Sequence, residues 1–306
     1  MAQVTVVLPV YNGEEHLEQA VTSILDQSFR DLQLVIVDDA STDNSLKVLE
    51  KFSDPRIVVI QHSVNTGLPG ALLDGISRAS GEYIARQDQD DFSHPMRLEK
   101  QCSLLNFNRS LGLVGTWASI LNVNAQDQWV TATQHRHPSG NSILKWRMLW
   151  SNPFVHSSMM MRHSVLETVG SYDTSPDRAL PEDFDLWSRM ARISEVANIP
   201  EVLQSYRQSP TGMSRTFADQ ILNGVIRVAS ENMGAALGLE ASDPEVRGLV
   251  QALNHSGGIA KPRSRVAHWA ALLNRAANSI DNFPITAWVN EVAPTQLRMM
   301  HNALIG

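Results

Sequence analysis

Three carboxylates follow the apolar run at residues 83–85, and their spacing is the first sign of chemistry in this 306-residue sequence. Asp88, Asp90 and Asp91 stand almost side by side, where like charges repel and each acid would be better solvated alone. Hard divalent cations such as Mg²⁺ and Mn²⁺ offset such repulsion, because they prefer oxygen ligands and bind carboxylates together with substrate phosphates. In a strand, Asp88 and Asp90 would point the same way and could bind a metal ion or a ribose on one face. The spacing alone also fits a solvated acidic turn before residues 93–95.

Buried strands and helices alternate before these acids. Continuous apolar or β-branched runs at residues 3–10 and 32–37 are typical of strands that are covered on both faces, as in parallel sheets. Strands are predicted at residues 3–10, 32–37, 57–61 and 81–87, and helices at 17–25, 42–52 and 65–79. Asn12 is expected to cap the first helix, and Ser41 or Thr42 the second. The alternation predicts βαβ units and an α/β fold with a mainly parallel sheet flanked by helices.

Polar residues follow each of the four predicted strands. They are Asn12-Gly13, Asp38-Asp39, Asn65 to Gly67, and Asp88 to Asp91. In open α/β sheets, ligands bind beyond the carboxyl ends of the strands. The four clusters are therefore expected to converge on one edge of the sheet. This convergence indicates a ligand site more strongly than any one of the short motifs does.

The pattern becomes mixed after residue 95 and helical after residue 215. Helices are predicted at residues 96–108, 143–149, 164–169 and 181–193, and strands at 112–121, 128–133, 201–206 and in a segment ending at 161. Further helices are predicted at residues 217–237, 244–253, 264–280 and 286–304. We expect an α/β domain at residues 1–215 and a helical C-terminal region at residues 216–306.

The composition is that of an ordinary globular protein, with 43% apolar and 19% charged residues. A formal net charge of −7 argues against a nucleic-acid-binding protein. The single cysteine, Cys102, excludes an internal disulfide and a cysteine-rich zinc site, and it suits a reducing compartment. No apolar run approaches the roughly 20 residues that span a bilayer, and the chain enters a strand pattern at once. We therefore expect a cytoplasmic protein, with peripheral membrane contact left open.

The end of the chain is basic in this acidic protein. Residues 257–306 contain Lys261, Arg263, Arg265, Arg275 and Arg298 against Asp281 and Glu291, which gives 5 − 2 = +3. Apolar residues recur on the same predicted helices. We expect this region to pack on the rest of the chain or on a second subunit, and the second case would make the protein an oligomer. The region could also contact an anionic membrane.

Read together, five ordered motifs resemble the family 2 glycosyltransferases with the GT-A fold. They are Leu8 to Gly13, Val37 to Asp43, Gly81 to Arg86 followed by Asp88-x-Asp90-Asp91, Asn152 to Ser158, and Glu182 to Trp187. The resemblance covers roughly residues 3–215, and it is greatest to the bacterial members that build surface polysaccharides. It implies an inverting, metal-dependent hexosyltransferase. The donor would be a nucleotide-diphosphate sugar, with a UDP-sugar favoured, and the acceptor a hydroxyl of a saccharide or a lipid-linked molecule.

The resemblance also assigns site residues. Those implied for binding the nucleotide-sugar are Pro9, Tyr11, Asn12, Asp38, Asp39, Asn65, Gly67, Arg86, Asp88, His156 and Glu182, and those for binding Mn²⁺ or Mg²⁺ are Asp88, Asp90 and Asp91. Asp39, beside Asp38, would accept a hydrogen bond from the uracil N3–H. Arg86 would either support the acids or meet a phosphate.

Asp183 would be the catalytic base, at the start of a helix whose dipole favours a charged carboxylate. It would take the proton of the acceptor hydroxyl as that oxygen attacks the anomeric carbon. The same acid, read without the family, is an exposed helix-start residue. Asp185 is expected to point off another side of the helix. Trp146, Trp150 and Trp187 fit either a sugar platform or a core.

Two departures from the family pattern affect the site. Many members carry Tyr-Arg-x-His after the last strand, whereas this chain has Ser209 in place of the histidine. Gln89 replaces the small residue that is usual between the two acids, which could alter the fit of the sugar.

Three other functions are alternatives to a glycosyltransferase. A non-catalytic nucleotide-sugar-binding protein that kept the fold is the main alternative, and the presence of Asp183 beside an intact Asp-x-Asp argues against it. A nucleotidyltransferase would show a glycine-rich, basic loop after the first strand, but residues 11–15 are acidic. A nicotinamide dehydrogenase would need G-x-G-x-x-G after a strand.

Overall fold

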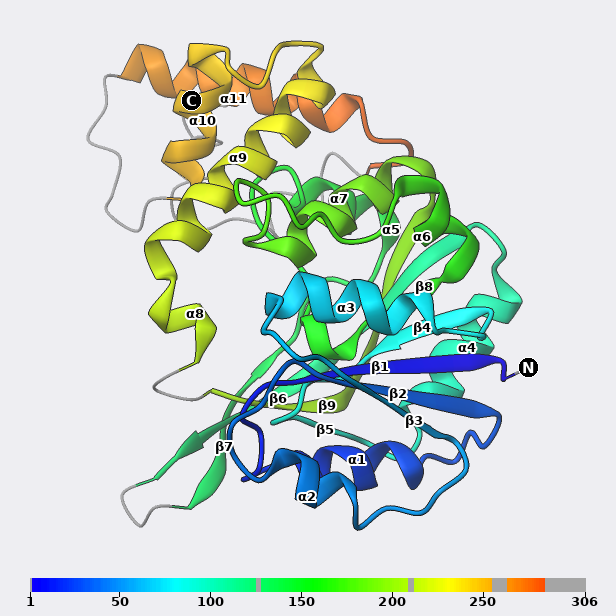
Figure 1. Cartoon of the computed structure of the whole chain (residues 1–306). Coiled ribbons are helices and arrows are strands. Elements are labelled where there is room, and N and C mark those ends of the chain that lie inside the picture. The colour runs from blue at the N-terminus through cyan, green and yellow to red at the C-terminus, as the bar shows by residue number, and fades with distance from the viewer. Residues whose placement is uncertain (1, 125–127, 209–211, 255–262, 284–306) are drawn as a thin grey trace. The chain divides into compact units, whose positions relative to one another are not determined.

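The computed structural model describes residues 2–124, 128–208, 212–254 and 263–283 (Figure 1). The chain divides into two units. The first unit contains Met1–Ser139 and Phe154–Thr216, and the second contains Gly140–Pro153 and Phe217–Gly306. The second boundary lies next to residue 215, where the sequence indicates one, but residues 140–153 group with the C-terminal helices. The helix predicted at residues 286–304 lies outside the described residues.

A parallel half-sheet begins the first unit. Its strands run in the order β3 (Ile57–Gln61), β2 (Leu32–Asp38), β1 (Val4–Val10) and β4 (Tyr83–Arg86), all parallel to their neighbours. These are the four strands that the sequence predicts. The helices α1 (Leu17–Leu25), α2 (Ser45–Leu49) and α3 (Gly67–Ser77) connect them. Figure 1 shows α3 on one side of this half-sheet and α1 and α2 on the other.

The two faces of β1 explain this arrangement. Alternate residues of β1 lie in one core cluster with the apolar sides of α1, α2 and α4 (Arg97–Phe107). Gly75 of α3 approaches the opposite face, where an added Cβ would lie 2.5 Å from a methyl group of Val7. Because strand side chains alternate between faces, a strand covered on both sides is apolar throughout. All seven residues of β1 are buried, in agreement with the prediction.

The second half of the sheet is mixed. β8 (Met160–Arg162) pairs antiparallel with β4, and β6 (Leu111–Val123), β9 (Glu195–Arg207) and β5 (Phe92–Ser93) follow, while β7 (Trp129–His135) pairs with β6. β9 begins six residues before the predicted strand. Pro200 indicates a strand boundary, but it lies at an irregularity of register between the pairs Thr116–Ile199 and Trp117–Val202, where its missing N–H interrupts no regular ladder.

Further helices complete the first unit. The helix caps predicted at Asn12 and at Ser41 or Thr42 are wrong. The 3₁₀ turn η1 (His156–Ser158), α6 (His163–Val169), α7 (Glu182–Ile193) and α8 (Met213–Thr216) belong to this unit. α1 is preceded by His16 and α2 by Asn44, and neither is capped by a side chain. Asn12, with φ 52°, accepts a bond from the backbone N–H of Thr42 instead, at 2.8 Å.

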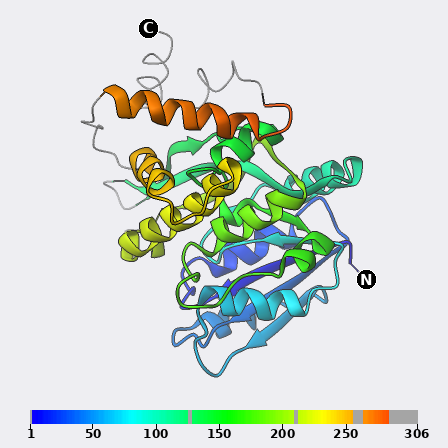
Figure 2. The same ribbon diagram turned by 90° about the horizontal axis from the view of Figure 1, so that it is seen from above.

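The second unit consists of helices. α5 (Asn141–Arg147), α9 (Ala218–Leu237), α10 (Pro244–Asn254) and α11 (Arg263–Asn278) form it, and both views place α10 and α11 beside α9 (Figures 1 and 2). Trp146 and Trp150 are buried here and contact each other edge to face at 5.1 Å. They are therefore core residues. In the part of the chain that is described, no helix has the length and apolar character needed to cross a membrane.

Candidate functional site

The loops after β1 and β2 are joined by hydrogen bonds at the carboxyl edge of the sheet. Asn12 N–H donates to Ser41 Oγ at 3.0 Å, and Gly13 N–H donates to Ser45 Oγ at 2.9 Å. The side chain of Gln89, from the loop after β4, reaches the backbone of Tyr11. The polar clusters therefore converge as the strand order predicts. Tyr11 remains 48% exposed at this edge, and Pro9 lies one residue before the buried end of β1.

Asp39 connects this edge to the loop before α3. Its Oδ1 accepts bonds from the N–H and hydroxyl of Thr66, both at 2.8 Å, and its Oδ2 accepts from Gly67 N–H at 2.9 Å. Burial acts to raise the pKa of Asp39, but these bonds and one with His62 lower it below its usual value. Asn65 Nδ2 donates to the Asp39 carbonyl at 3.1 Å.

Asp38 differs from its neighbour in its surroundings. It is fully buried, and its Oδ2 accepts from Ser41 N–H at 3.3 Å. Within the described residues, Asp38 Oδ1 is buried without a hydrogen-bond partner. A buried acceptor without a donor costs free energy, and such groups in native structures commonly mark functional or solvated positions.

Arg86, the last residue of β4, is fully buried and positions Asp88. Its Nη2 donates to Asp88 Oδ1 at 2.5 Å, its Nη1 donates to the carbonyl of Val7 at 3.2 Å, and its Nε donates to His156 Nε2 at 3.1 Å. Of the two roles that the resemblance leaves open, these contacts favour support of the acids. A guanidinium with no exposed surface cannot meet a phosphate without rearrangement.

The three acids after β4 do not form the single cluster that the sequence predicts. Asp88 and Asp90 are half-buried, whereas Asp91 is fully buried and accepts from Ser157 Oγ at 2.5 Å and from Arg207 N–H at 2.9 Å. In the described part of the chain, no three His, Cys, Asp or Glu side chains are grouped to bind a metal ion. The oxygens of Asp91 accept bonds inside the protein, and the binding of a metal ion by all three carboxylates stays a prediction.

The electrostatics of Asp90 differ from those of an ordinary exposed acid. Burial and then the charge of Asp88 raise the pKa of Asp90 to about 6. Arg207, whose guanidinium donates to the Asp90 carbonyl, lies over the rings of Phe92 and Trp129. The pair Asp88–Asp90 thus carries negative charge that the surrounding protein only partly compensates.

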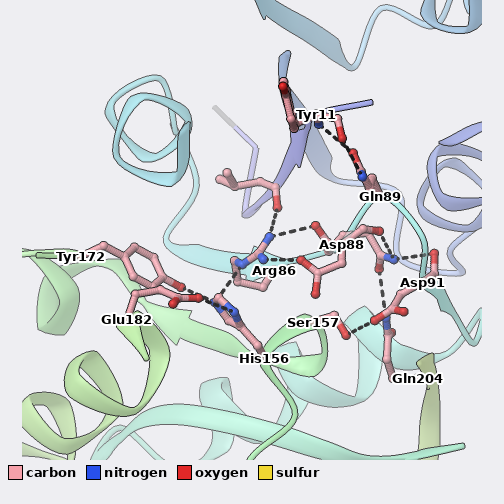
Figure 3. A network of polar contacts seen from close by, with 12 residues as sticks. Tyr11, Arg86, Asp88, Gln89, Asp91, His156, Ser157, Tyr172, Glu182 and Gln204 are labelled. Atoms are coloured by element: carbon pink, nitrogen blue, oxygen red, sulfur yellow. Dashed lines mark hydrogen bonds and ion pairs between the residues drawn. The ribbon is translucent and has the colours of Figure 1, made fainter. Parts of the chain in front are cut away.

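His156, in η1, joins the acid loop to the start of α7 (Figure 3). Its Nε2 accepts from Arg86 Nε and lies 2.9 Å from the hydroxyl of Tyr172, and its Nδ1 lies 3.4 Å from Glu182 Oε1. Burial and then the charge of Arg86 lower the pKa of His156 well below its usual value. A neutral imidazole that accepts at Nε2 carries its proton on Nδ1, which faces Glu182.

Asp183 and Glu182 begin α7. Asp183 is half-buried, and its Oδ1 accepts from Phe184 N–H at 2.6 Å. Glu182 is buried, and burial followed by the charge of Asp183 raises the pKa of Glu182 to about 8. Two adjacent carboxylates that share a confined space favour a state in which only one is charged.

Two neighbours of this pair have structural roles. Asp185 is buried and accepts from Arg178 Nη1 at 2.5 Å and Arg189 Nε at 2.9 Å. Trp187 is fully buried, with its ring centroid 5.8 Å from that of His156 and 6.3 Å from that of Tyr172. Trp187 therefore belongs to the core beneath the site. Of the two roles expected for it, a platform for a sugar or a core residue, the structure shows the second.

Tyr172 was not found by sequence reasoning. It follows the turn at Gly170 and reaches His156 through its hydroxyl. The sequence offers one indication of its role: Tyr172 is an aromatic residue with a polar end, and it lies between the motifs at residues 152–158 and 182–187. Ser157 belongs to a recognised motif, but only the fold shows that it binds Asp91.

Known proteins with similar sequences are glycosyltransferases. Residues 5–170 match the family described as Glycosyl transferase family 2. The putative glycosyltransferase EpsE of Bacillus subtilis is 33% identical over 229 residues, which are 73% of this chain and 80% of the relative. The amylovoran biosynthesis glycosyltransferase AmsE of Erwinia amylovora is 30% identical over 208 residues, 66% of this chain and 75% of the relative.

Solved structures agree in fold. TarS from S. aureus, residues 1–349 in complex with UDP, superposes with a TM-score of 0.62 at 18% identity, over 98% of this chain and 86% of that one. The mannosyltransferase PcManGT from Pyrobaculum calidifontis, in complex with GDP-Man and Mn²⁺, gives 0.59 at 16% identity, over 99% and 80%. These likenesses confirm the GT-A fold, and the sequence matches establish that the chain belongs to glycosyl transferase family 2.

Proposed function

We propose that this glycosyltransferase is an inverting, metal-dependent enzyme of surface polysaccharide biosynthesis that works in the cytoplasm. It moves a sugar from a UDP-sugar to a hydroxyl of a saccharide or lipid-linked acceptor. One observation carries the proposal: Arg86 and His156 connect Asp88, two residues before Asp90, to Glu182, the neighbour of Asp183. The arrangement places acids for a diphosphate at one end of this bonded chain of side chains and a base for an acceptor next to its other end.

Asp88 and Asp90 fit a divalent cation. They are half-buried acids, and burial and then the charge of Asp88 raise the pKa of Asp90. A hard cation bound to both carboxylates would relieve their repulsion. We assign the metal to these two acids, while Asp91 fixes the loop. When bound, Mn²⁺ or Mg²⁺ would neutralise charge on the leaving diphosphate. The PcManGT complex with Mn²⁺ supports this choice by analogy of fold.

The nucleoside would lie at the loops after β1 and β2. Asp39 Oδ2 accepts one bond within the described residues, from Gly67 N–H, and a carboxylate oxygen can accept a second from a base N–H. The exposed ring of Tyr11 offers an apolar face beside it. The UDP complex of TarS supports UDP as the nucleotide, and the name of AmsE supports polysaccharide synthesis.

Asp183 would act as the base. Glu182, with its raised pKa, keeps a proton near neutral pH, so that the charge of the pair resides on Asp183. The acceptor hydroxyl gives its proton to Asp183 as its oxygen attacks the anomeric carbon. The bond from that carbon to the UDP oxygen breaks on the opposite face, which inverts the configuration.

Calorimetric titration with UDP tests the donor site. Affinity should be higher with MnCl₂ or MgCl₂ than with EDTA, and Asp90→Asn should abolish the difference. Equal affinity with metal and with EDTA would contradict the metal role. GDP serves as the comparison nucleotide.

UDP release from UDP-sugars, with and without saccharide acceptors, tests transfer. A non-catalytic binding protein would bind the nucleotide-sugar and release no UDP with any acceptor. Flotation with anionic and neutral liposomes tests the membrane contact, and binding to neither would exclude it.

A further inference from the structure

Gln89 lies between Asp88 and Asp90 in the sequence, but its side chain points back toward the end of β1. Its Oε1 accepts from the N–H of Tyr11 at 2.8 Å, and its Nε2 donates to the carbonyl of Tyr11 at 3.1 Å (Figure 3). One carboxamide thus meets both backbone groups of one residue, as a neighbouring strand would. Whether Gln89 also alters the fit of the sugar stays a prediction, whereas its contact with the backbone is a feature of the structure.

The Gln89–Tyr11 bridge lies beyond the regular pairing of β1 with β4. That ladder ends at the pair Val7–Arg86, with one more bond from Gln87 N–H to the Val7 carbonyl at 3.2 Å. Past this point β1 continues beside β2 to the pair Val10–Asp38, while the chain after β4 turns into the acid loop. The side chain of Gln89 therefore bridges two loops that the backbone ladder no longer connects.

Gly13 makes room for the bridge. A Cβ added to Gly13 would lie 2.6 Å from Gln89 Oε1 and 2.8 Å from its Cδ, far inside van der Waals contact. Gly13 N–H is itself fixed by Ser45 Oγ, so the glycine cannot simply move away. The close approach shows that Gln89 packs against the loop as well as bonding to it.

We propose that Gln89 is a positioning residue that sets the distance between the nucleoside end and the diphosphate end of the donor site. The inference rests on the proposed function, in which Tyr11 flanks the base and Asp88 and Asp90 face the diphosphate. A nucleoside diphosphate must contact both loops at once. Loops that are already bridged lose less conformational freedom when it binds.

Gln89→Met tests the bridge, because methionine has a similar length and lacks both hydrogen-bonding groups. Hydrogen–deuterium exchange of the peptide that contains Tyr11 should become faster without ligand, since its N–H loses an acceptor. The Kd for UDP with MnCl₂ should rise about tenfold, as expected for the loss of a few well-placed bonds. KM for the UDP-sugar should rise in parallel while kcat stays nearly constant. Gln128→Met, at an exposed position, is the matched control.

A double-mutant cycle with Gly13 separates the bridge from general damage. Gly13→Ala should displace Gln89 and weaken UDP binding to a similar extent. In a Gln89→Ala background the same change should add little, because the clash and the bridge are both gone. Fully additive losses would contradict the proposal.

The outcomes distinguish this inference from the proposed function. Unchanged exchange at Tyr11 in Gln89→Met would show that the bridge does not order the loop. A wild-type protein that binds UDP, with an unchanged Kd in Gln89→Met, would overturn the role of Gln89 and leave the proposed function in place. A wild-type protein that binds no UDP would overturn the proposed function, and the nucleotide role of Gln89 with it.

Discussion

Asp183 is the residue on which the proposed chemistry depends. Asp183→Asn keeps the size and the bond from Phe184 N–H but cannot take a proton at neutral pH. Because general-base assistance is typically worth about 10²–10⁴ in rate, we expect a loss of that order in sugar transfer. The affinity for UDP should change little, since this carboxylate addresses the acceptor. Steady-state transfer and calorimetry with UDP measure the two effects separately.

The control for this experiment follows from the structure. Asp185→Asn is expected from the sequence to cost far less than Asp183→Asn, but Asp185 is a buried acceptor for Arg178 and Arg189. Removing its charge would take one charged acceptor away from each of these cations and lower stability. Asp177→Asn, at an exposed position before α7, is the better control. Near wild-type transfer by Asp183→Asn would rule out this residue as the base.

Glu182 gives the fold a predictable pH dependence. Because its pKa is raised from 4.5 to about 8, the folded protein binds a proton that the unfolded chain releases at lower pH. The free energy of unfolding should therefore fall as pH rises through this window, by at most about 1.4 kcal/mol for each pH unit. Glu182→Gln has no proton to release, so its stability should fall less. Urea unfolding between about pH 5 and 8 measures both slopes.

Glu50→Gln controls for the change of an exposed glutamate to glutamine. It should keep the wild-type slope. If Glu182→Gln and the wild type lose stability equally with pH, Glu182 does not keep its proton in the folded state.

At the scale of the elements, the sequence predicts the parallel half of the sheet well. Each of its strands is a local apolar run that ends in a polar turn, so the pattern and the structure agree. The direction of Asp91 could not be predicted in the same way. It depends on Ser157 and Arg207, which lie 66 and 116 residues further along the chain. Tyr172 was missed for the same reason, since its partner His156 belongs to another element.

Asp91 links the acid loop to η1 and β9, and this linkage can be tested. Asp91→Ala leaves the Ser157 hydroxyl and the Arg207 N–H buried without an acceptor. We expect the free energy of unfolding to fall by about 2–4 kcal/mol, as is usual when buried donors lose their partner. Asp90→Ala should cost far less, because Asp90 is only half-buried and its loss leaves the Ser157 hydroxyl and the Arg207 N–H with their acceptor. Equal losses in urea unfolding would show that Asp91 is no more structural than Asp90.

At the scale of the whole molecule, the helical unit includes a segment that the sequence assigns to the α/β domain. Residues 140–153 lie in the middle of the chain, yet Trp146 contacts Phe283 with ring centroids 5.1 Å apart. Asn232 Nδ2 donates to the Met148 carbonyl at 2.8 Å. A boundary drawn from composition near residue 215 cannot reveal contacts between segments so far apart in sequence.

This organisation predicts the behaviour of a shortened chain. A protein that ends at residue 216 would keep Trp146 and Trp150 but lose the C-terminal helices of the unit in which they are buried. We expect it to have a lower Tm and to self-associate, because large apolar side chains would be exposed. In the full chain, Trp146→Ala should cost about 3–5 kcal/mol, as for other buried aromatic residues. Polar replacement of both tryptophans should restore part of the solubility of the short chain.

A monomeric short chain with an unchanged Tm would instead support an independent domain at residues 1–215. Calorimetry and sedimentation of the short and full chains decide between these outcomes.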